Sequence, residues 1–188
     1  MQRLRLKNPA HHNGDGAVPD GRGRLYDPAM RDTLSTFGRR TQVERLETLA
    51  ALRLAANRVH TAMERWADEH GLSESRLKVL MALHHSPDGR LPLGQLADLL
   101  DVVPRTITDV VDVLQRDGLV RRTPDPDDRR SIHAQLTKQG RERVESISRD
   151  AVSRQTALFG GFDSVQMAEL RHLCLLLVRG LSRAEGGS

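Results

Sequence analysis

Residues 91–140 decide the fold, and they read LPLGQLADLLDVVPRTITDVVDVLQRDGLVRRTPDPDDRRSIHAQLTKQG. The apolar spacing predicts two short helices over 93–100 and 104–117, and the pattern that follows predicts two strands over 119–123 and 131–136. A charged loop with two prolines joins the strands. Two helices followed by a hairpin form a helix-turn-helix with a β-wing, an arrangement suited to laying one helix in a DNA groove with a loop beside it.

The second of these helices has two chemically different faces. One face carries the i, i+3, i+4, i+7 spacing that packs onto a core, at Ile107, Val110, Val111 and Leu114. The opposite face is polar and carries Arg105, Asp109, Asp112 and Arg116, flanked by Thr106 and Thr108. Pro104 suits the first turn of a helix, whose positive end attracts phosphate groups.

Arg105 is the candidate on the polar face for reading a base. A guanidinium can donate two hydrogen bonds to a guanine edge, a contact worth ~1–3 kcal/mol of discrimination. Thr106 and Thr108 are candidates to bind phosphates or to touch a thymine methyl group. The alternative is that Arg105 only pairs with Asp109 one turn further on. The wing that follows in the sequence favours the DNA interpretation.

The loop between the two strands ends in DDRR at residues 127–130, which places two arginines near the tip of a hairpin. Guanidinium groups stay charged and a narrow minor groove concentrates negative potential, so we expect Arg129 and Arg130 to contact DNA. Arg121 and Arg122, in the preceding strand, are expected to add phosphate contacts. Without the helix-turn-helix before it, the same loop would indicate only an ordinary charged surface hairpin.

Amphipathic helices flank this block on both sides. A long helix is predicted over 43–70, and helical pattern resumes over 138–183 with one break at a glycine pair. Ser73 is predicted to cap the helix before the helix-turn-helix, and Asp163 with Gln166 to cap the last helix. The apolar positions are Leu49, Leu52, Ala56, Val59, Met63 and Trp66 in the first helix, and Leu170, Leu173, Leu177 and Leu181 in the last.

The predicted fold class is mainly α with a small β-wing. A winged helix-turn-helix over about 73–137, with long terminal helices, lies in a domain of residues 41–188. Residues 1–40 carry eight Lys/Arg against four Asp/Glu and few large apolar groups, so we expect a flexible basic tail. Residues 41–188 carry 21 of each charge, so DNA binding would depend on locally placed arginines rather than on net charge.

Composition excludes several classes of protein. No apolar run reaches the ~20 residues of a membrane-spanning helix, and no apolar stretch follows the basic N-terminus as in a signal peptide. The single cysteine, Cys174, excludes an intramolecular disulfide, suits a reducing cytoplasm and lies in an apolar run where we expect it to be buried. No paired carboxylates, activated nucleophile or metal-ligand set stands out, so we expect neither an enzyme nor a bound cofactor.

The helix-turn-helix and wing resemble those of the MarR family of winged-helix transcriptional regulators. Six segments match the family in order and near its spacing, at 96–100, 106–108, 111–114, 117–120, 125–130 and 136–140. The resemblance implies a homodimer built through the terminal helices, which would bind a near-palindromic double-stranded DNA site with half-sites ~34–36 Å apart. It also implies that Asp128 and Arg130 brace the wing, and that Asp112 pairs with that arginine.

Two positions of the second helix depart from the family pattern. Asp109 and Val113 stand where many members carry arginine, and the carboxylate of Asp109 would repel a nearby phosphate. The base contacts of the family therefore do not transfer residue by residue, and more of the binding is expected to come from Arg105 and the wing.

The family often binds small aromatic or phenolic effectors between its dimer helices and its DNA-binding lobes. The candidate lining residues here are Arg58, His60, Trp66, His84 and His85, each of which is otherwise an ordinary surface or core residue. The predicted function is a cytoplasmic, ligand-responsive repressor that binds DNA as a homodimer. The alternative is a winged-helix module that binds DNA or protein without sensing an effector.

Overall fold

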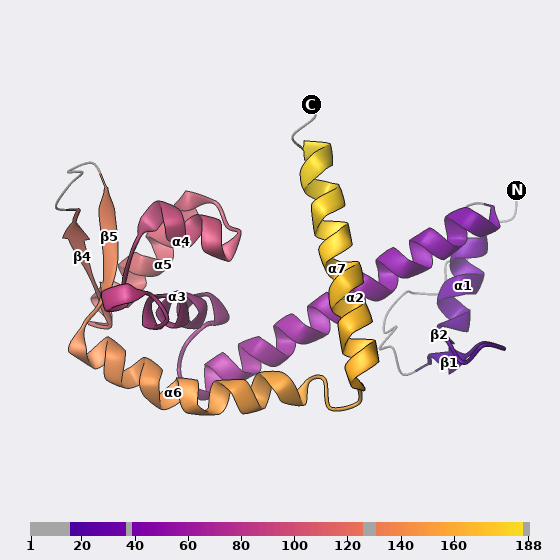
Figure 1. The fold of residues 1–188 in the computed structure, drawn as a ribbon, viewed down its shortest axis with the longest axis horizontal. Coiled ribbons are helices and arrows are strands. Elements are labelled where there is room, and N and C mark those ends of the chain that lie inside the picture. Colours follow the sequence, from indigo (N-terminus) through magenta and orange to yellow (C-terminus); the bar gives the residue numbers. More distant parts are fainter. Residues whose placement is uncertain (1–15, 37–38, 126–130, 186–188) are drawn as a thin grey trace, which may run out of the picture. The chain divides into compact units, whose positions relative to one another are not determined.

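The computed structural model describes residues 16–36, 39–125 and 131–185. These residues form seven α-helices, one short 3-10 helix (Pro87–Gly89) and five short strands, and the chain divides into two units, Met1–Trp66 and Ala67–Ser188 (Figure 1). A mainly helical chain with a small antiparallel sheet is the predicted fold class, which is thereby confirmed. Among the described residues, no helix has both the length and the apolar character that crossing a membrane requires.

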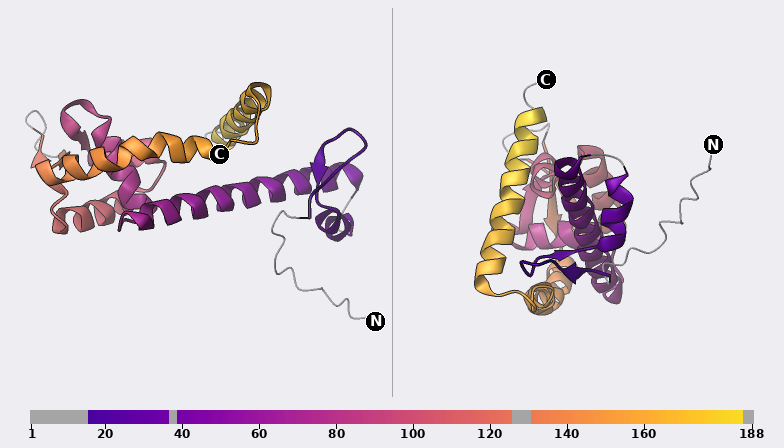
Figure 2. Two further views of the ribbon diagram at one scale, coloured as in Figure 1. Left: turned by 90° about the horizontal axis from the view of Figure 1, so that it is seen from below. Right: turned by 90° about the vertical axis from the view of Figure 1, so that its right-hand side faces the viewer.

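In the first unit, a β-hairpin and a short helix lie against the N-terminal part of a long helix (Figure 1, Figure 2). β1 (Val18–Pro19) pairs antiparallel with β2 (Leu25–Tyr26), α1 spans Pro28–Ser35, and the long helix α2 spans Arg40–Glu69. The carboxylate of Asp27 caps α1 by accepting a hydrogen bond from the backbone N–H of Met30 at 3.1 Å.

Arg31 fastens the hairpin and α1 to α2. Its Nε and Nη2 donate to the two carboxylate oxygens of Glu47 at 2.6 and 3.2 Å, and its guanidinium carbon lies 3.9 Å from the ring centre of Tyr26. Residues 17–36 thus differ from the flexible tail that the composition predicts, because a bidentate ion pair and a cation–π contact hold a segment with little apolar surface. Residues 1–15 of the predicted tail lie outside the described residues.

The second unit contains the helix-turn-helix and its core. α3 spans Glu74–His84, α4 spans Leu93–Leu100 and α5 spans Pro104–Arg116, within one residue of the predicted helix-turn-helix boundaries. The Oγ of Ser73 caps α3 as predicted, accepting from the N–H of Arg76 at 3.4 Å. The largest fully buried side chains are Val79, Leu80, Leu83, Leu96, Ile107, Val111, Leu114, Val120, Val144 and Ile147.

A three-stranded antiparallel sheet forms the wing in the order β3-β5-β4. β4 (Val120–Pro124) and β5 (Ile132–Leu136) match the two predicted strands, and β3 (Arg90–Pro92) is an additional edge strand that pairs with β5. Residues 126–130, which connect β4 to β5 in the sequence, lie outside the described residues.

Two further helices complete the second unit, α6 (Lys138–Ala157) and α7 (Ser164–Glu185). The predicted capping pair of α7 is confirmed, since the N–H of Asp163 donates to Gln166 Oε1 at 3.0 Å and the N–H of Gln166 donates to Asp163 Oδ1 at 2.8 Å. At the start of α6, Gly140 approaches β4 so closely that a Cβ there would lie 1.9 Å from the carbonyl oxygen of Leu119. The sheet and α6 therefore meet backbone to backbone.

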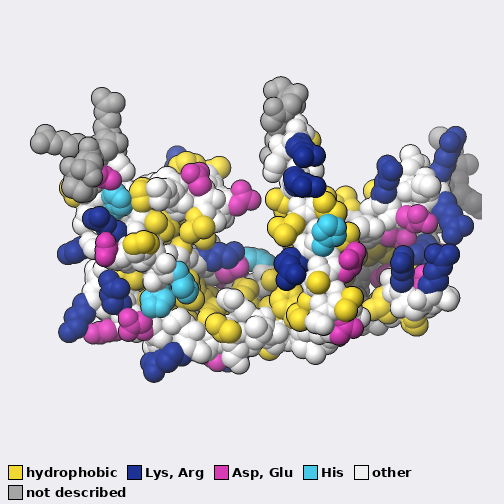
Figure 3. Space-filling model, in the orientation of Figure 1, with side chains coloured by type: hydrophobic (Ala, Val, Ile, Leu, Met, Phe, Trp, Pro, Cys, Tyr) yellow, Lys and Arg dark blue, Asp and Glu magenta, His cyan; other side chains and the backbone are white. Residues whose placement is uncertain are grey.

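α7 carries an apolar stripe that is exposed in the single chain, and hydrophobic side chains are visible along it (Figure 3). The stripe contains the four predicted positions, Leu170, Leu173, Leu177 and Leu181, which are 39% to 57% exposed. Cys174 is exposed rather than buried as expected, because every described side chain of α7 is exposed in the single chain.

Candidate nucleic-acid interface

α5 buries one face and presents the other to solvent. Its three apolar anchors are at most 2% exposed, at Ile107, Val111 and Leu114, and they lie where α5 meets α3, α4 and β4. The opposite side carries the exposed residues Arg105, Thr108 and Asp109, and Thr106 is half-buried. The residues predicted to meet DNA are therefore on the solvent side of a helix whose position is fixed by its core side.

Among the described residues, no side chain caps the N-terminus of α5. Val103 precedes the helix and carries no polar atom in its side chain, and Pro104 at the first position has no N–H. The hydroxyl of Thr108 is turned back to donate to the carbonyl of Pro104 at 3.2 Å. The positive end of the helix dipole is thus open to solvent beside Arg105, where an anion such as a phosphate is favoured.

Arg105 and Asp109 lie one turn apart on the exposed side of α5. Within the described parts of the chain, no salt bridge joins their side chains, whereas Asp112 on the same helix does pair with an arginine. The guanidinium of Arg105 is therefore available to a base or a phosphate, and the carboxylate of Asp109 faces solvent without that neighbour to neutralise it.

Arg122 of β4 ties the wing to α5. Its Nη1 donates to Oδ1 of Asp112, and its Nη2 lies 3.4 Å from the backbone carbonyl oxygen of Thr108. The structure pairs Asp112 with Arg122, because the strand brings this residue directly beside the helix. The pairing of Asp112 with Arg130 that the family resemblance implied stays a prediction. Arg130 itself lies outside the described residues, as do Asp128 and Arg129.

Arg121 and Arg122 leave opposite faces of β4, since successive side chains alternate along a strand. Arg121 donates from Nε to Oε1 of Gln135, its cross-strand partner on β5, at 3.1 Å. Arg122 instead borders an open hollow of about 550 Å³ between α5 and β4, together with Asp112, Gln115 and Arg116. Both arginines were expected to contact phosphates, but their side chains lie on opposite faces of β4. Only Arg122 lies on the face next to α5.

The base of the wing contains a contact between a histidine and a carboxylate that the sequence did not reveal. His133 of β5 is 8% exposed, and its Nε2 lies 3.4 Å from Oδ2 of Asp125. The backbone N–H of Asp125 also donates to the carbonyl of Ser131 at 3.0 Å, which closes the hairpin below its tip. A single histidine in a short strand has no spacing signature, so this contact could only be found in three dimensions.

The five residues expected to line an effector pocket fall in both units. Arg58, His60 and Trp66 belong to α2, where Trp66 is 4% exposed. His84 ends α3 and His85 follows it, with their rings edge to face and 5.2 Å apart between centroids. A common pocket for all five remains a prediction.

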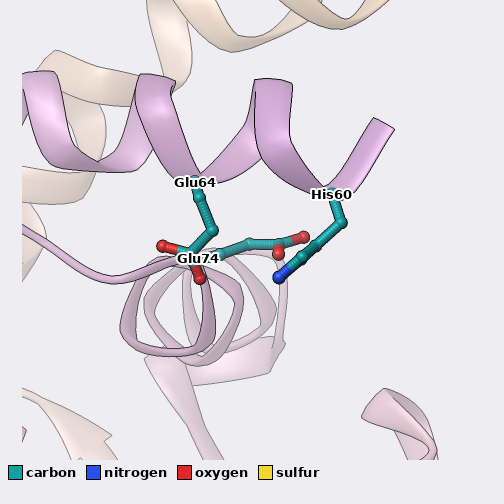
Figure 4. A group of neighbouring side chains, drawn as sticks. All are labelled: His60, Glu64 and Glu74. Atoms are coloured by element: carbon teal, nitrogen blue, oxygen red, sulfur yellow. The ribbon is translucent and has the colours of Figure 1, made fainter. Parts of the chain in front are cut away.

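Figure 4 shows His60 and Glu64 one helical turn apart on the same face of α2. Glu74, drawn with them, is the first residue of α3, and its carboxylate pairs with Nζ of Lys78 at 2.7 Å. The two possible ligands on α2 are fewer than the three or four protein ligands that zinc sites use, and the expected absence of a metal site stays a prediction.

Comparisons with known proteins point to one family. The MarR family model matches residues 72–132, from just before α3 to the first residue of β5. The HTH-type transcriptional repressor YetL of Bacillus subtilis is 33% identical over 117 residues, which make up 62% of this chain and 70% of that protein. The transcriptional activatory protein BadR of Rhodopseudomonas palustris is 27% identical over 135 residues, 71% of this chain and 77% of its own length.

Solved structures agree with the sequence relatives. Sco3205, a MarR family transcriptional regulator from Streptomyces coelicolor in complex with DNA, superimposes with a TM-score of 0.67 at 25% identity, covering 73% of this chain and 88% of that one. Sco5413, a MarR family regulator from the same organism, gives a TM-score of 0.62 at 28% identity over 77% of this chain and 96% of that one. Both similarities extend well beyond the residues that the family model matches.

Proposed function

This chain belongs to the MarR family of DNA-binding transcriptional regulators, and we propose that it is a repressor that binds a near-palindromic operator as a homodimer and releases it when a small molecule binds. The members found by comparison are regulators rather than enzymes, which places this chain in a non-enzymatic family. The operator, the dimer, the repression and the response to a ligand are the proposed parts.

The observation that carries the DNA-binding proposal is the exposed side of α5. Arg105 lies there beside an uncapped helix N-terminus, and the adjacent strand β4 is held to the helix by Arg122 and Asp112. A helix with one arginine at its leading end suits direct readout of a guanine, while the wing supplies further positive charge through Arg129 and Arg130.

The homodimer proposal is supported by the exposed apolar stripe of α7. Leucines that are about half exposed along one side of a 22-residue helix form a patch that soluble monomers rarely leave open. A second copy of the chain with the same stripe would cover it by two-fold symmetry. Two copies of α5 would then address two half-sites, which is why the operator is expected to be near-palindromic.

Repression and a ligand response are the finer parts of the proposal. A relative with the name of a repressor supports repression, although a second relative bears the name of an activator. A ligand would lower operator affinity only if it bound the DNA-incompetent arrangement more tightly than the competent one. The alternative of a winged-helix module without effector sensing predicts an operator complex that no small molecule dissociates.

Selection of bound sequences from a random DNA pool tests the proposal with the full chain. We expect enrichment of an inverted repeat whose half-site centres are about 10 base pairs apart, or a multiple of that spacing. Binding without any enriched sequence would overturn the sequence-specific operator, and enrichment of a single half-site would overturn the two-fold dimer. Repeating the selection with phenols and aromatic acids tests the ligand response, and a reporter placed behind the selected site gives the sign of regulation.

A further inference from the structure

Two hollows lie side by side in the first unit, on either side of the ion pair between Arg31 and Glu47. The larger has a volume of about 1020 Å³ and the smaller of about 270 Å³, and both residues line both hollows. The hairpin, α1 and the first half of α2 supply all the lining residues. The pair of hollows is therefore formed by residues that the helix-turn-helix and wing do not use.

The larger hollow is lined by more positive than negative side chains. Its charged residues are Arg22, Arg24, Arg31 and Arg40 on one hand and Asp20, Glu44 and Glu47 on the other. Lys and Arg side chains gather over this region, around α1 and the start of α2, on the face drawn in Figure 3. The excess of positive charge is only one. The partners of each carboxylate therefore determine how much positive charge is left to bind a ligand.

Two of the three carboxylates accept hydrogen bonds from the protein, and the third has an arginine nearby. Glu47 accepts both bonds from Arg31, and Glu44 lies 3.7 Å from Nε of Arg40. Asp20 accepts backbone hydrogen bonds at 2.8 and 2.9 Å, and these N–H groups keep the pKa of its carboxyl below the ordinary value, so it stays ionised.

The guanidinium groups of Arg22 and Arg24 are not used in salt bridges among the described residues. Both residues bind Asp20 through their backbone N–H groups. Arg31 uses Nε and Nη2 on Glu47, and its Nη1 has no hydrogen-bond partner in the described part of the chain. Planar guanidinium donors in the lining of a hollow suit a carboxylate or a similar small anion.

The smaller hollow has the opposite character. Its walls include Leu25, Tyr26, Met30, Ala51 and Leu54, which offer mainly apolar atoms. A volume of about 270 Å³ is near the lower end of ligand pockets, which run from ~300 to ~1000 Å³, and it suits a short apolar chain. The guanidinium of Arg31 lies over the ring of Tyr26 and so marks the boundary between the charged and the apolar hollow.

We propose that the first unit binds a small carboxylate with a short apolar chain, its anionic end against Arg22, Arg24 and Arg31 and its chain between Tyr26, Met30 and Leu54. This site lies within the first unit, and it goes beyond the proposed function because it requires neither DNA nor the winged helix. Binding would add contacts between the hairpin and α2, and would therefore stabilise the first unit by mass action.

The test uses the one tyrosine of the chain, Tyr26, as a reporter. The full-length protein is labelled with fluorotyrosine, which gives a single ¹⁹F resonance at the proposed site, and is titrated without DNA. The probes are hexanoate, acetate (which lacks the apolar chain) and hexan-1-ol (which lacks the charge). We expect hexanoate to shift the resonance saturably and to bind at least about tenfold more tightly than either control, because only hexanoate fills both hollows.

Substitutions separate the two halves of the site. Arg22→Gln with Arg24→Gln keeps both backbone donors to Asp20 and should weaken hexanoate by about tenfold or more without affecting hexan-1-ol. Ala51→Leu should fill the apolar hollow and weaken hexanoate but not acetate. Arg53→Gln removes an exposed arginine of α2 that does not line either hollow, and should leave all three titrations unchanged.

Three results would overturn the site. These are the absence of a saturable shift with hexanoate, equal affinity for acetate or hexan-1-ol, and a hexanoate affinity unchanged by the two glutamines. The resonance of each unliganded variant shows whether the surroundings of Tyr26 are retained, so a collapsed hairpin is not mistaken for lost binding. Since no DNA is present, failure here would leave the proposed operator binding untouched.

Discussion

Arg122 on strand β4 and Asp112 on helix α5 form an ion pair that joins the wing to the recognition helix. The pair predicts a positioning role for Arg122. If it holds the wing, Arg122→Ala and Asp112→Ala should each weaken operator affinity on the order of three- to tenfold, and the double variant should be no worse than either single one. Stability should fall by only about 1 kcal/mol or less, since both side chains are partly exposed.

A direct phosphate contact by Arg122 predicts a different pattern. Only Arg122→Ala would then weaken binding, and the dependence of log affinity on log salt would lose about one unit of slope, while Asp112→Ala would bind as well as the wild type or better. Fluorescence anisotropy on the selected operator at several salt concentrations distinguishes the two roles. Arg121→Ala is a matched control, because that side chain is engaged with Gln135 on the opposite face of the strand.

Gly140 gives a prediction about stability rather than binding. A methyl group there would collide with the carbonyl of Leu119, and neither backbone can move without shifting α6 or β4. Gly140→Ala should therefore lower the free energy of unfolding by at least about 2 kcal/mol, measured by urea denaturation. Gly94→Ala in α4 is the control, because a Cβ there meets nothing within 4 Å and should be neutral or stabilising. Equal stabilities for the two variants would contradict the close approach.

The helix-turn-helix was predictable from sequence because its signals are local. The apolar spacing of α5 and the proline at its first position mark the helix to within a residue of its observed end. The capping pair Asp163 and Gln166 was predictable for the same reason, since both partners belong to one helical turn. In both cases the start or end of the helix is determined by residues within that helix or next to it in the sequence.

The contacts that were missed join residues far apart in the chain. β3 has only three residues and depends on β5 for its pairing, so it is too short to show an alternation of apolar and polar residues. The hairpin before α1 is held by Arg31 and Glu47, 16 residues apart on two elements, in a segment whose low apolar content favoured a tail. Arg122 and Asp112 likewise belong to a strand and a helix, and their pairing depends on the place of β4 beside α5.

The apolar stripe of α7 predicts that the dimer depends on this helix. Leu173→Asp with Leu177→Asp would place two carboxylates on the apolar stripe that the second copy is expected to cover. Burying an unpaired carboxylate costs several kcal/mol, a substantial part of the roughly 8 kcal/mol that holds a micromolar complex together. Sedimentation should then show a monomer where the wild type is a dimer. Arg179→Asp on the same helix introduces the same charge half a turn away from Leu177 and should remain dimeric. A monomeric wild type at micromolar concentration would refute the dimer outright.

Asp109 gives the sharpest test of how α5 reads DNA. It is exposed beside Arg105, and no salt bridge between the two is present among the described residues. If it faces the operator, its carboxylate repels phosphates at every site but can accept a hydrogen bond from a cytosine amino group at the correct one. Asp109→Arg should then raise affinity for random duplex and lower the ratio of specific to non-specific affinity by about tenfold, which corresponds to roughly 1.4 kcal/mol.

The alternative is that Asp109 lies beside the interface as a solvated charge. Reversal of its charge would then raise both affinities slightly through a long-range effect that salt screens, and the ratio would not change. Glu145→Arg on α6 makes the same change in net charge on a helix not assigned to the interface, and so measures that long-range effect directly. Both variants are compared with the wild type on operator and random duplex at one fixed ionic strength. If the ratio falls in Asp109→Arg but not in Glu145→Arg, the carboxylate contributes to operator choice, and if the two variants behave alike, it does not.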